Sequence, residues 1–221
     1  MSKTLLFSDW LYVHGGYRHK PKTKEELIRA IDAEIKTQGP EANLGYIDTS
    51  DIKDMSGLFM GWDRVACDIS NWNVSKVKDM SQMFKNAKNV DVDLSYWNVS
   101  NVTNMFEMFC QSDFNGDISR WDVSNVKNMS RMFSNNTSFN GDISQWTTYN
   151  VTDMSGMFAD SDFNQDIRMW NVVHVKNMDR IFFNNKKFNH DISRWNTKNL
   201  KSSYEAFANS AYKYRYPQGI S

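Results

Sequence analysis

The stretch FNGDISRWDVSNVKNMSRMF, residues 114–133, decides the fold of this chain because the sequence repeats it. Residues 139–158 read FNGDISQWTTYNVTDMSGMF, the same pattern displaced by 25 positions. A repeat of about 20–50 residues is typical of proteins that stack copies of one short unit. Tryptophans recur at intervals of 24 or 25 residues and mark six copies, which are expected to form a structural ladder: Trp72, Trp97, Trp121, Trp146, Trp170 and Trp195.

The spacing of apolar residues changes within one copy, and this change predicts the local structure. Met154, Met157 and Phe158 stand at i, i+3 and i+4, which indicates one face of a helical turn. Trp121 and Val123 alternate, as in a short extended segment. One coil cannot bury its own apolar face, so parallel coils would place Trp on Trp, Met on Met and Phe on Phe. We therefore predict an α/β repeat solenoid of about seven 24–25-residue coils, each with a short parallel strand and a short helix.

The two ends of the chain depart from the repeat and predict caps. Thr23 and Glu26 make a capping-box pattern before apolar residues at helical spacing, and Gly39 ends that pattern. Such a helix would cover the open apolar end of the first coil. The C-terminal tyrosines are expected to cover the last coil, with a basic aromatic grip for a partner as the alternative. The predicted units are 1–43, an N-terminal cap with a short extended segment and a helix at 23–38; 44–207, the repeat solenoid; and 208–221, a C-terminal cap or tail.

Composition excludes several classes of function. Lys plus Arg and Asp plus Glu number 26 each, so the chain lacks the positive surplus of a nucleic-acid binder. Cys67 and Cys110 occupy different positions of their repeats, which favours free thiols over a disulfide. No apolar stretch approaches the ~20 residues of a membrane span, and the first residues do not form a secretory signal. We expect a cytoplasmic monomer, or a cell-surface protein if a leader was removed.

The motif resembles a known family. Four copies, beginning at Phe114, Phe139, Phe163 and Phe188, carry almost the whole FNxDISxWxVSNVTxMxxMF pattern of BspA-like leucine-rich-repeat surface proteins. The resemblance covers roughly Leu44 to Phe207, and the lead-in PKTKEELIRAIDAEI is also similar. It implies a right-handed, leucine-rich-repeat-like solenoid and a role in binding proteins, often host or cell-surface ones. The first residues do not resemble the signal or lipoprotein leader of that family, so we expect the fold more firmly than surface display.

Polar residues recur with the same period, which argues against catalysis because a catalytic group is needed only once. Each Asp of the D-I-S pattern is expected to accept main-chain N–H groups at a turn, and the Asn before the second Val to satisfy backbone groups between coils. A line of metal ligands is the alternative for Asp, but calcium-binding repeats need more glycine. We expect no enzyme, no metal and no cofactor. These aspartates are Asp68, Asp93, Asp117, Asp142, Asp166 and Asp191.

Positions that vary within the constant frame are the candidates for function. The residue before each tryptophan is enriched in Tyr, Arg and Met, the types favoured at protein interfaces. We predict a non-enzymatic protein-binding module that uses this face. The alternatives are an intracellular immunity or antagonist protein, a surface adhesin, and, from a different class, a metal- or glycan-binding solenoid that uses the Asp ladder. The predicted contact residues are Tyr96, Arg120, Gln145, Met169 and Arg194, together with Phe106, which replaces a recurring Ser.

Overall fold

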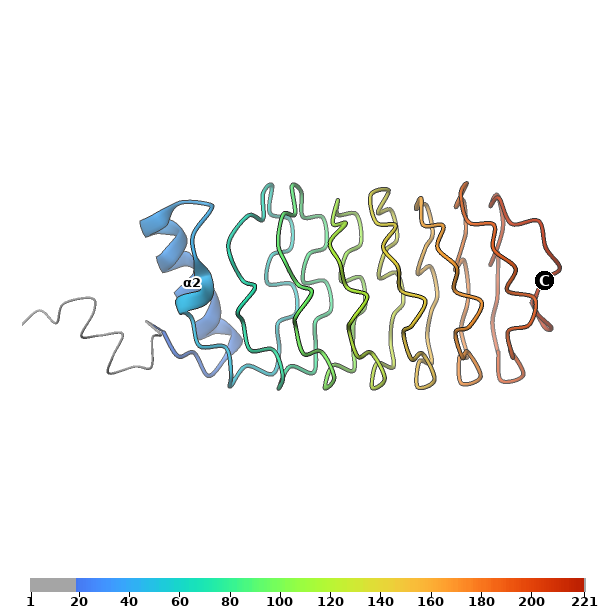
Figure 1. Cartoon of the computed structure of the whole chain (residues 1–221), viewed down its shortest axis with the longest axis horizontal. Coiled ribbons are helices and arrows are strands. Elements are labelled where there is room, and N and C mark those ends of the chain that lie inside the picture. The colour runs from blue at the N-terminus through green and yellow to red at the C-terminus, as the bar shows by residue number, and fades with distance from the viewer. Residues whose placement is uncertain (1–18, 221) are drawn as a thin grey trace, which may run out of the picture.

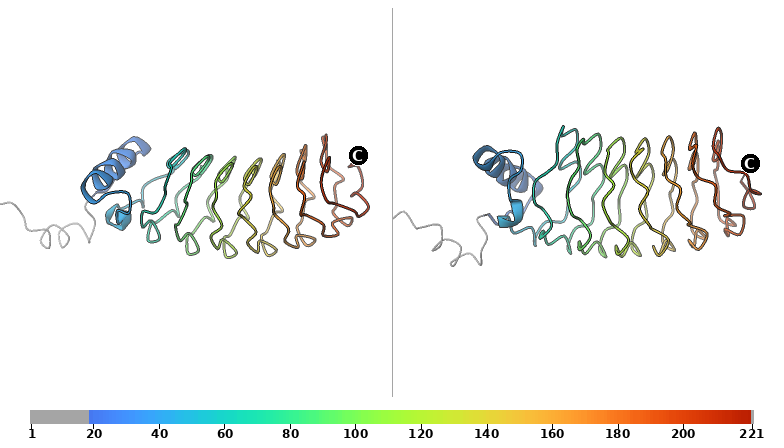
Figure 2. Two further views of the ribbon diagram at one scale, coloured as in Figure 1. Left: turned by 90° about the horizontal axis from the view of Figure 1, so that it is seen from above. Right: turned by 45° about the horizontal axis from the view of Figure 1, so that its top comes forward.

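A computed structural model describes residues 19–220 of the chain as an elongated row of coils. The coils stand side by side along the long axis in all three views (Figures 1 and 2). Helix α2, Lys24–Gln38, lies at the N-terminal end, and a single 3₁₀ turn, η1, spans Leu44–Tyr46. The described residues contain no strand and no sheet, and the coils are joined by isolated parallel bridges such as Asn128↔Asp153.

The predicted α/β solenoid, with a strand and a helix in every coil, is therefore wrong. The i, i+3, i+4 spacing of Met and Phe fits a helix, but it fits consecutive tight turns equally well. In the described coils, the residue before the second Met has a positive φ, for example +55° at Arg131. A second positive φ follows two residues after the Phe, at Asn135. Each left-handed residue reverses the local course of the chain, so a right-handed helix cannot continue through it.

Each coil is instead a series of four-residue turns, several of which begin and end on apolar residues. In one coil the N–H of Trp121 donates to the carbonyl of Ile118, and Val126 donates to Val123 in the same way. Met132 donates to Met129, which closes a third turn. Each of these i→i+3 hydrogen bonds is 2.9–3.2 Å long. Since all six of these side chains point inward and are buried, the turns themselves produce the apolar spacing of three.

A main-chain ladder joins each coil to the next. Along the Met-Phe segment, every second N–H donates to a carbonyl of the following coil, because the intervening N–H groups are used inside the turns. Thus the N–H of Met129 donates to the carbonyl of Asp153 at 3.0 Å, and the N–H of Phe133 donates to the carbonyl of Met157 at 3.0 Å. Just before this segment the direction reverses, and Lys127 N–H donates back to the Thr103 carbonyl of the preceding coil. The backbone is hydrogen-bonded between coils without any regular strand.

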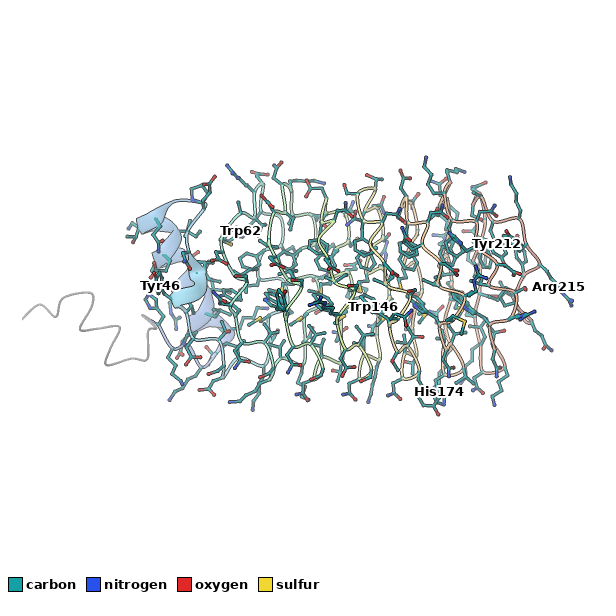
Figure 3. The ribbon with its side chains drawn as sticks, in the orientation of Figure 1. Tyr46, Trp62, Trp146, His174, Tyr212 and Arg215 are labelled. Atoms are coloured by element: carbon teal, nitrogen blue, oxygen red, sulfur yellow. The ribbon has the colours of Figure 1, made fainter. Side chains whose placement is uncertain are left out.

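Aromatic rings form columns through the interior. One continuous column has centroid separations of 5.4–5.8 Å: Phe59, Phe84, Phe109, Phe133, Phe158, Phe182 and Phe207. Tryptophan rings stack at 6.3–6.5 Å, as for Trp121 and Trp146, and Figure 3 shows Trp146 inside the row of coils. Offset stacking at these separations is favourable beyond the buried area alone. The predicted stacking of Trp on Trp and Phe on Phe is confirmed.

Both ends of this core are covered. The hydroxyl of Thr23 caps α2 by accepting from Glu26 N–H at 3.2 Å, and the apolar face of the helix joins the core of the first coil. At the other end the ring of Tyr212 packs on Phe207 at 4.5 Å, and Tyr216 packs on it at 4.9 Å. The C-terminal tyrosines are therefore a cover, as expected. The extended segment predicted at the start of the chain lies almost entirely outside the described residues.

Candidate functional site

The tryptophans of the ladder are buried and join adjacent coils. Each indole N–H donates to a main-chain carbonyl of the preceding coil, always that of the Ile or Leu in the D-I-S position, at 2.9–3.3 Å. Trp146, for example, donates to Ile118. The ladder indoles are at most 4% exposed. Burying an indole requires a partner for its N–H, and the neighbouring coil supplies one.

The periodic aspartates make turns. In each of the six, Oδ1 accepts the N–H of the residue two positions later at 2.9–3.1 Å. In Asp93 the hydroxyl and the N–H of Ser95 lower the pKa of the carboxyl. The same kind of contact lowers the pKa of Asp117, Asp142 and Asp191. Residues 19–220 contain no group of three His, Cys, Asp or Glu side chains arranged to hold a metal ion.

A second ladder runs through the position before the second Val. The amide of Asn101 donates to the Ser75 carbonyl of the preceding coil at 2.8 Å, and Asn125, Asn150 and Asn199 repeat the contact at 2.7–2.8 Å. His174 replaces Asn in one coil, and its Nδ1 lies 2.8 Å from the Tyr149 carbonyl (Figure 3). These side chains hold adjacent coils together.

Buried polar residues that sequence reasoning missed complete the frame. Asn136 is fully buried; its amide donates to the Phe114 carbonyl at 3.1 Å, and its Oδ1 accepts from Ser138 and Phe139 N–H at 2.8–2.9 Å. Asn185 repeats this arrangement two coils later. Asn136 and Asn185 each lie three positions after the Phe of the Met-Phe segment, and this shared position in the repeat could have identified them from the sequence. Cys67 and Cys110 are buried and free, which confirms that prediction.

The residues before the tryptophans form a different kind of surface, which we call the pre-tryptophan stripe. All six are exposed: Asn71, Tyr96, Arg120, Gln145, Met169 and Arg194. Tyr96 and Met169 are 77% and 80% exposed, unusually high values for such residues. The guanidinium of Arg120 lies 5.7 Å from the centre of the Tyr96 ring. Coil stacking thus brings residues about 24 positions apart in the chain into one row.

The C-terminal part of the stripe is hollowed. A shallow hollow of about 390 Å³ lies between adjacent coils and is lined by Arg168, Met169 and Arg194 among others. A second, of about 590 Å³, shares Arg194 and continues to Lys198. Arg168 is held by Asp166 at 2.6 Å. An apolar side chain beside cationic groups in a shallow hollow resembles the anchoring points of protein interfaces.

Phe106 is not part of this stripe. It is half-buried and lies on the Met-Phe segment, where its carbonyl accepts from Gln82 of the preceding coil. Its neighbour Glu107 is almost completely buried and pairs with Lys85 at 2.5 Å and Arg131 at 3.2 Å. Burial opposes ionisation of Glu107, but these cations and the Gln82 amide lower its pKa overall. This cluster links three successive coils.

Comparison with known proteins places the chain in a family. A family model described as "Mycoplasma protein of unknown function, DUF285" matches residues 31–125 and, a second time, residues 110–217. The chain belongs to this family. Two overlapping matches agree with the internal repeat, and the family description assigns no function. The chain matches no curated protein and no solved structure. Neither helix of the described residues is long and apolar enough to span a membrane.

Proposed function

We propose that this chain is a non-enzymatic protein-binding module that contacts its partner through the pre-tryptophan stripe. The observation that carries the proposal is the contrast between the stripe and the frame. The recurring Trp and Asn side chains are occupied by contacts between coils, and the recurring Asp side chains by turn contacts within a coil. The stripe side chains are exposed, and their types change from coil to coil. Variation on a constant frame is how a repeat surface acquires specificity.

The composition of the stripe supports a protein partner. Tyr, Arg and Met are enriched at protein interfaces, and buried Tyr and Arg anchors supply most of the binding energy. Tyr96 and Arg120 already lie against one another, so part of the entropy cost of ordering them is met before binding. The resemblance to BspA-like surface proteins, which bind other proteins, favours the same function.

A stripe variant with Tyr96→Ala, Arg120→Ala and Arg194→Ala tests the proposal. Wild-type chain is immobilised, exposed to extracts of its native source, and the captured proteins are identified by mass spectrometry. The matched control carries Lys53→Ala, Lys127→Ala and Lys176→Ala, which are also exposed and lie one to a coil on a different segment. Thermal unfolding checks that both variants remain folded.

We expect specific partners to be captured by the wild type and the lysine control and lost from the stripe variant. Truncating anchor residues among these three should cost about 2–4 kcal/mol of binding free energy, or roughly thirtyfold to a thousandfold in affinity. Unchanged capture by a folded stripe variant would remove this face from the proposal.

A further inference from the structure

The C-terminal end of the row of coils presents an unpaired line of main-chain donors. In the preceding coil, alternate N–H groups donate to the last coil at 2.8–2.9 Å: those of Met178, Arg180, Phe182 and Asn184. The last coil repeats the same backbone course, with a positive φ of 52° at Glu205 and 57° at Asn209. No described residue accepts from the corresponding N–H groups of this coil: Ser203, Glu205, Phe207 and Asn209.

The C-terminal tail covers the core at this end but leaves these donors unpaired. The ring of Tyr212 continues the column of Phe163 and Phe188, and the ring of Tyr216 lies on Phe207, where the next coil would stack. The tail is held by the Tyr212 hydroxyl, which donates to the Arg215 carbonyl at 3.1 Å (Figure 3). The apolar core is therefore covered at this end, whereas the four main-chain N–H groups have no acceptor among the described residues. An unpaired backbone edge of this kind is a template for another chain.

The same end is basic. Residues 192–220 contain one acidic side chain, Glu205, which is already paired with Arg180 at 2.7 Å. They contain five cationic side chains: Arg194, Lys198, Lys201, Lys213 and Arg215. All five are exposed. The balance of charge over the whole chain therefore conceals a surplus of positive charge in residues 192–220, the part of the chain that contains the four donors.

We propose that this edge binds an acidic polypeptide segment of a partner protein, which adds to the stack as one more set of turns. The main-chain carbonyls of the segment accept from the four unpaired N–H groups, and its carboxylates face the cationic side chains. Backbone addition of this kind supplies affinity through main-chain hydrogen bonds and selectivity through side chains. Two copies of this chain joined through this edge do not fit, because donors would face donors. None of the four donors belongs to the pre-tryptophan stripe; Arg194 is counted in both surfaces, and the edge proposal stands on the donors and the other four cationic side chains.

The chain itself provides a matched pair of peptides as probes. Within the stack, the carbonyls of residues 153–159 and those of residues 177–183 each accept the same alternate pattern of N–H groups from the preceding coil. A peptide of residues 150–163 contains three Asp and no cationic residue. The equivalent peptide of residues 174–187 contains four Lys or Arg and one Asp. Both can form the turns, and they differ in charge.

Amide hydrogen exchange of the full chain, followed by NMR with each peptide, tests the proposal. In the free protein, the four donors should exchange much faster than their counterparts at 178, 180, 182 and 184. The acidic peptide should slow exchange at the four donors by about tenfold or more, and the basic peptide should leave it unchanged. If the acidic peptide does not protect these amides, or if the basic one protects them equally, the proposal is wrong.

A charge-reversed variant provides a second readout. Lys213→Glu with Arg215→Glu should weaken binding of the acidic peptide about two- to thirtyfold, since an exposed ion pair contributes up to about fivefold. The control is Lys53→Glu with Lys127→Glu, which changes the net charge equally but lies in other coils. Equal weakening by both variants would indicate non-specific attraction and would overturn the assignment to this edge.

Discussion

Replacing one interior tryptophan measures how strongly the ladder holds the coils together. Trp146 is 3% exposed, and its ring stacks on Trp121 at 6.5 Å and on Trp170 at 6.3 Å. Its indole N–H also supplies the hydrogen bond to the Ile118 carbonyl at 3.1 Å. Trp146→Ala removes both ring contacts, leaves a cavity and removes one of the two donors to that carbonyl, which keeps the N–H of Trp121. Changes of this type cost about 3–5 kcal/mol.

Trp146→Phe separates the two contributions. A phenyl ring keeps much of the stacking but cannot donate to Ile118, whose carbonyl still accepts from Trp121 N–H, so the expected cost is about 0.5–1.5 kcal/mol, that of one hydrogen bond. Urea unfolding followed by far-UV circular dichroism measures both variants. The control is Met169→Ala, which changes an exposed side chain and should stay within about 0.5 kcal/mol. A cost below about 1 kcal/mol for Trp146→Ala would refute the argument that the ladder stabilises the stack.

Four further predictions follow from other contacts. Asn136→Ala should lower the free energy of unfolding by about 2–4 kcal/mol in urea titrations, because it leaves several buried main-chain groups without partners; an effect below about 0.5 kcal/mol would contradict this. Gln111 has φ +57°, so Gln111→Val should strain the folded backbone and lower Tm, whereas Gln111→Gly should not. Equal Tm values for the two variants would be inconsistent with a left-handed residue. Burial raises the pKa of Cys67 to about 12, so a thiol reagent at pH 8 should label it only after unfolding; rapid labelling of folded protein would disprove the burial. Hydrogen bonds in the D-I-S turns lower the pKa of Asp93 and Asp117 in the folded state. The stability that these hydrogen bonds contribute is therefore present above the unfolded pKa of about 3.9 and is lost as the pH falls below that value. Unfolding titrations from pH 6 to pH 3 should show this loss of stability, and constant stability over that range would count against the prediction.

The sequence predicted the repeat and its core but not the course of the chain within a coil. The core positions follow from period alone, since Trp, Met and Phe at fixed offsets must share one interior, and Trp146 and Phe158 are buried there. Apolar residues at i, i+3 and i+4 are compatible with both a helix and a series of turns. The deciding residues are those in between, such as Arg131, whose positive φ carries no clear signal because Arg is not a typical left-handed residue.

The candidate site was predictable to a similar degree. The positions of the stripe residues could be predicted from the repeat, because a residue adjacent to a buried tryptophan in an extended or turn segment points outward. Phe106 could not be placed from its replacement of Ser, and the structure puts it on another segment. The unpaired donors at the last coil depend on a hydrogen-bonding pattern that only the three-dimensional register of the coils reveals.

The conformation of the Met-Phe segment tests the central claim most directly, because the whole stack rests on turns rather than helices. Backbone φ angles at Arg131 and Asn135 can be measured by NMR from chemical shifts and three-bond couplings. The structure predicts positive values close to +55° and +56°. Negative, helical φ angles throughout residues 129–135 would show that each coil contains a helix and would contradict the account.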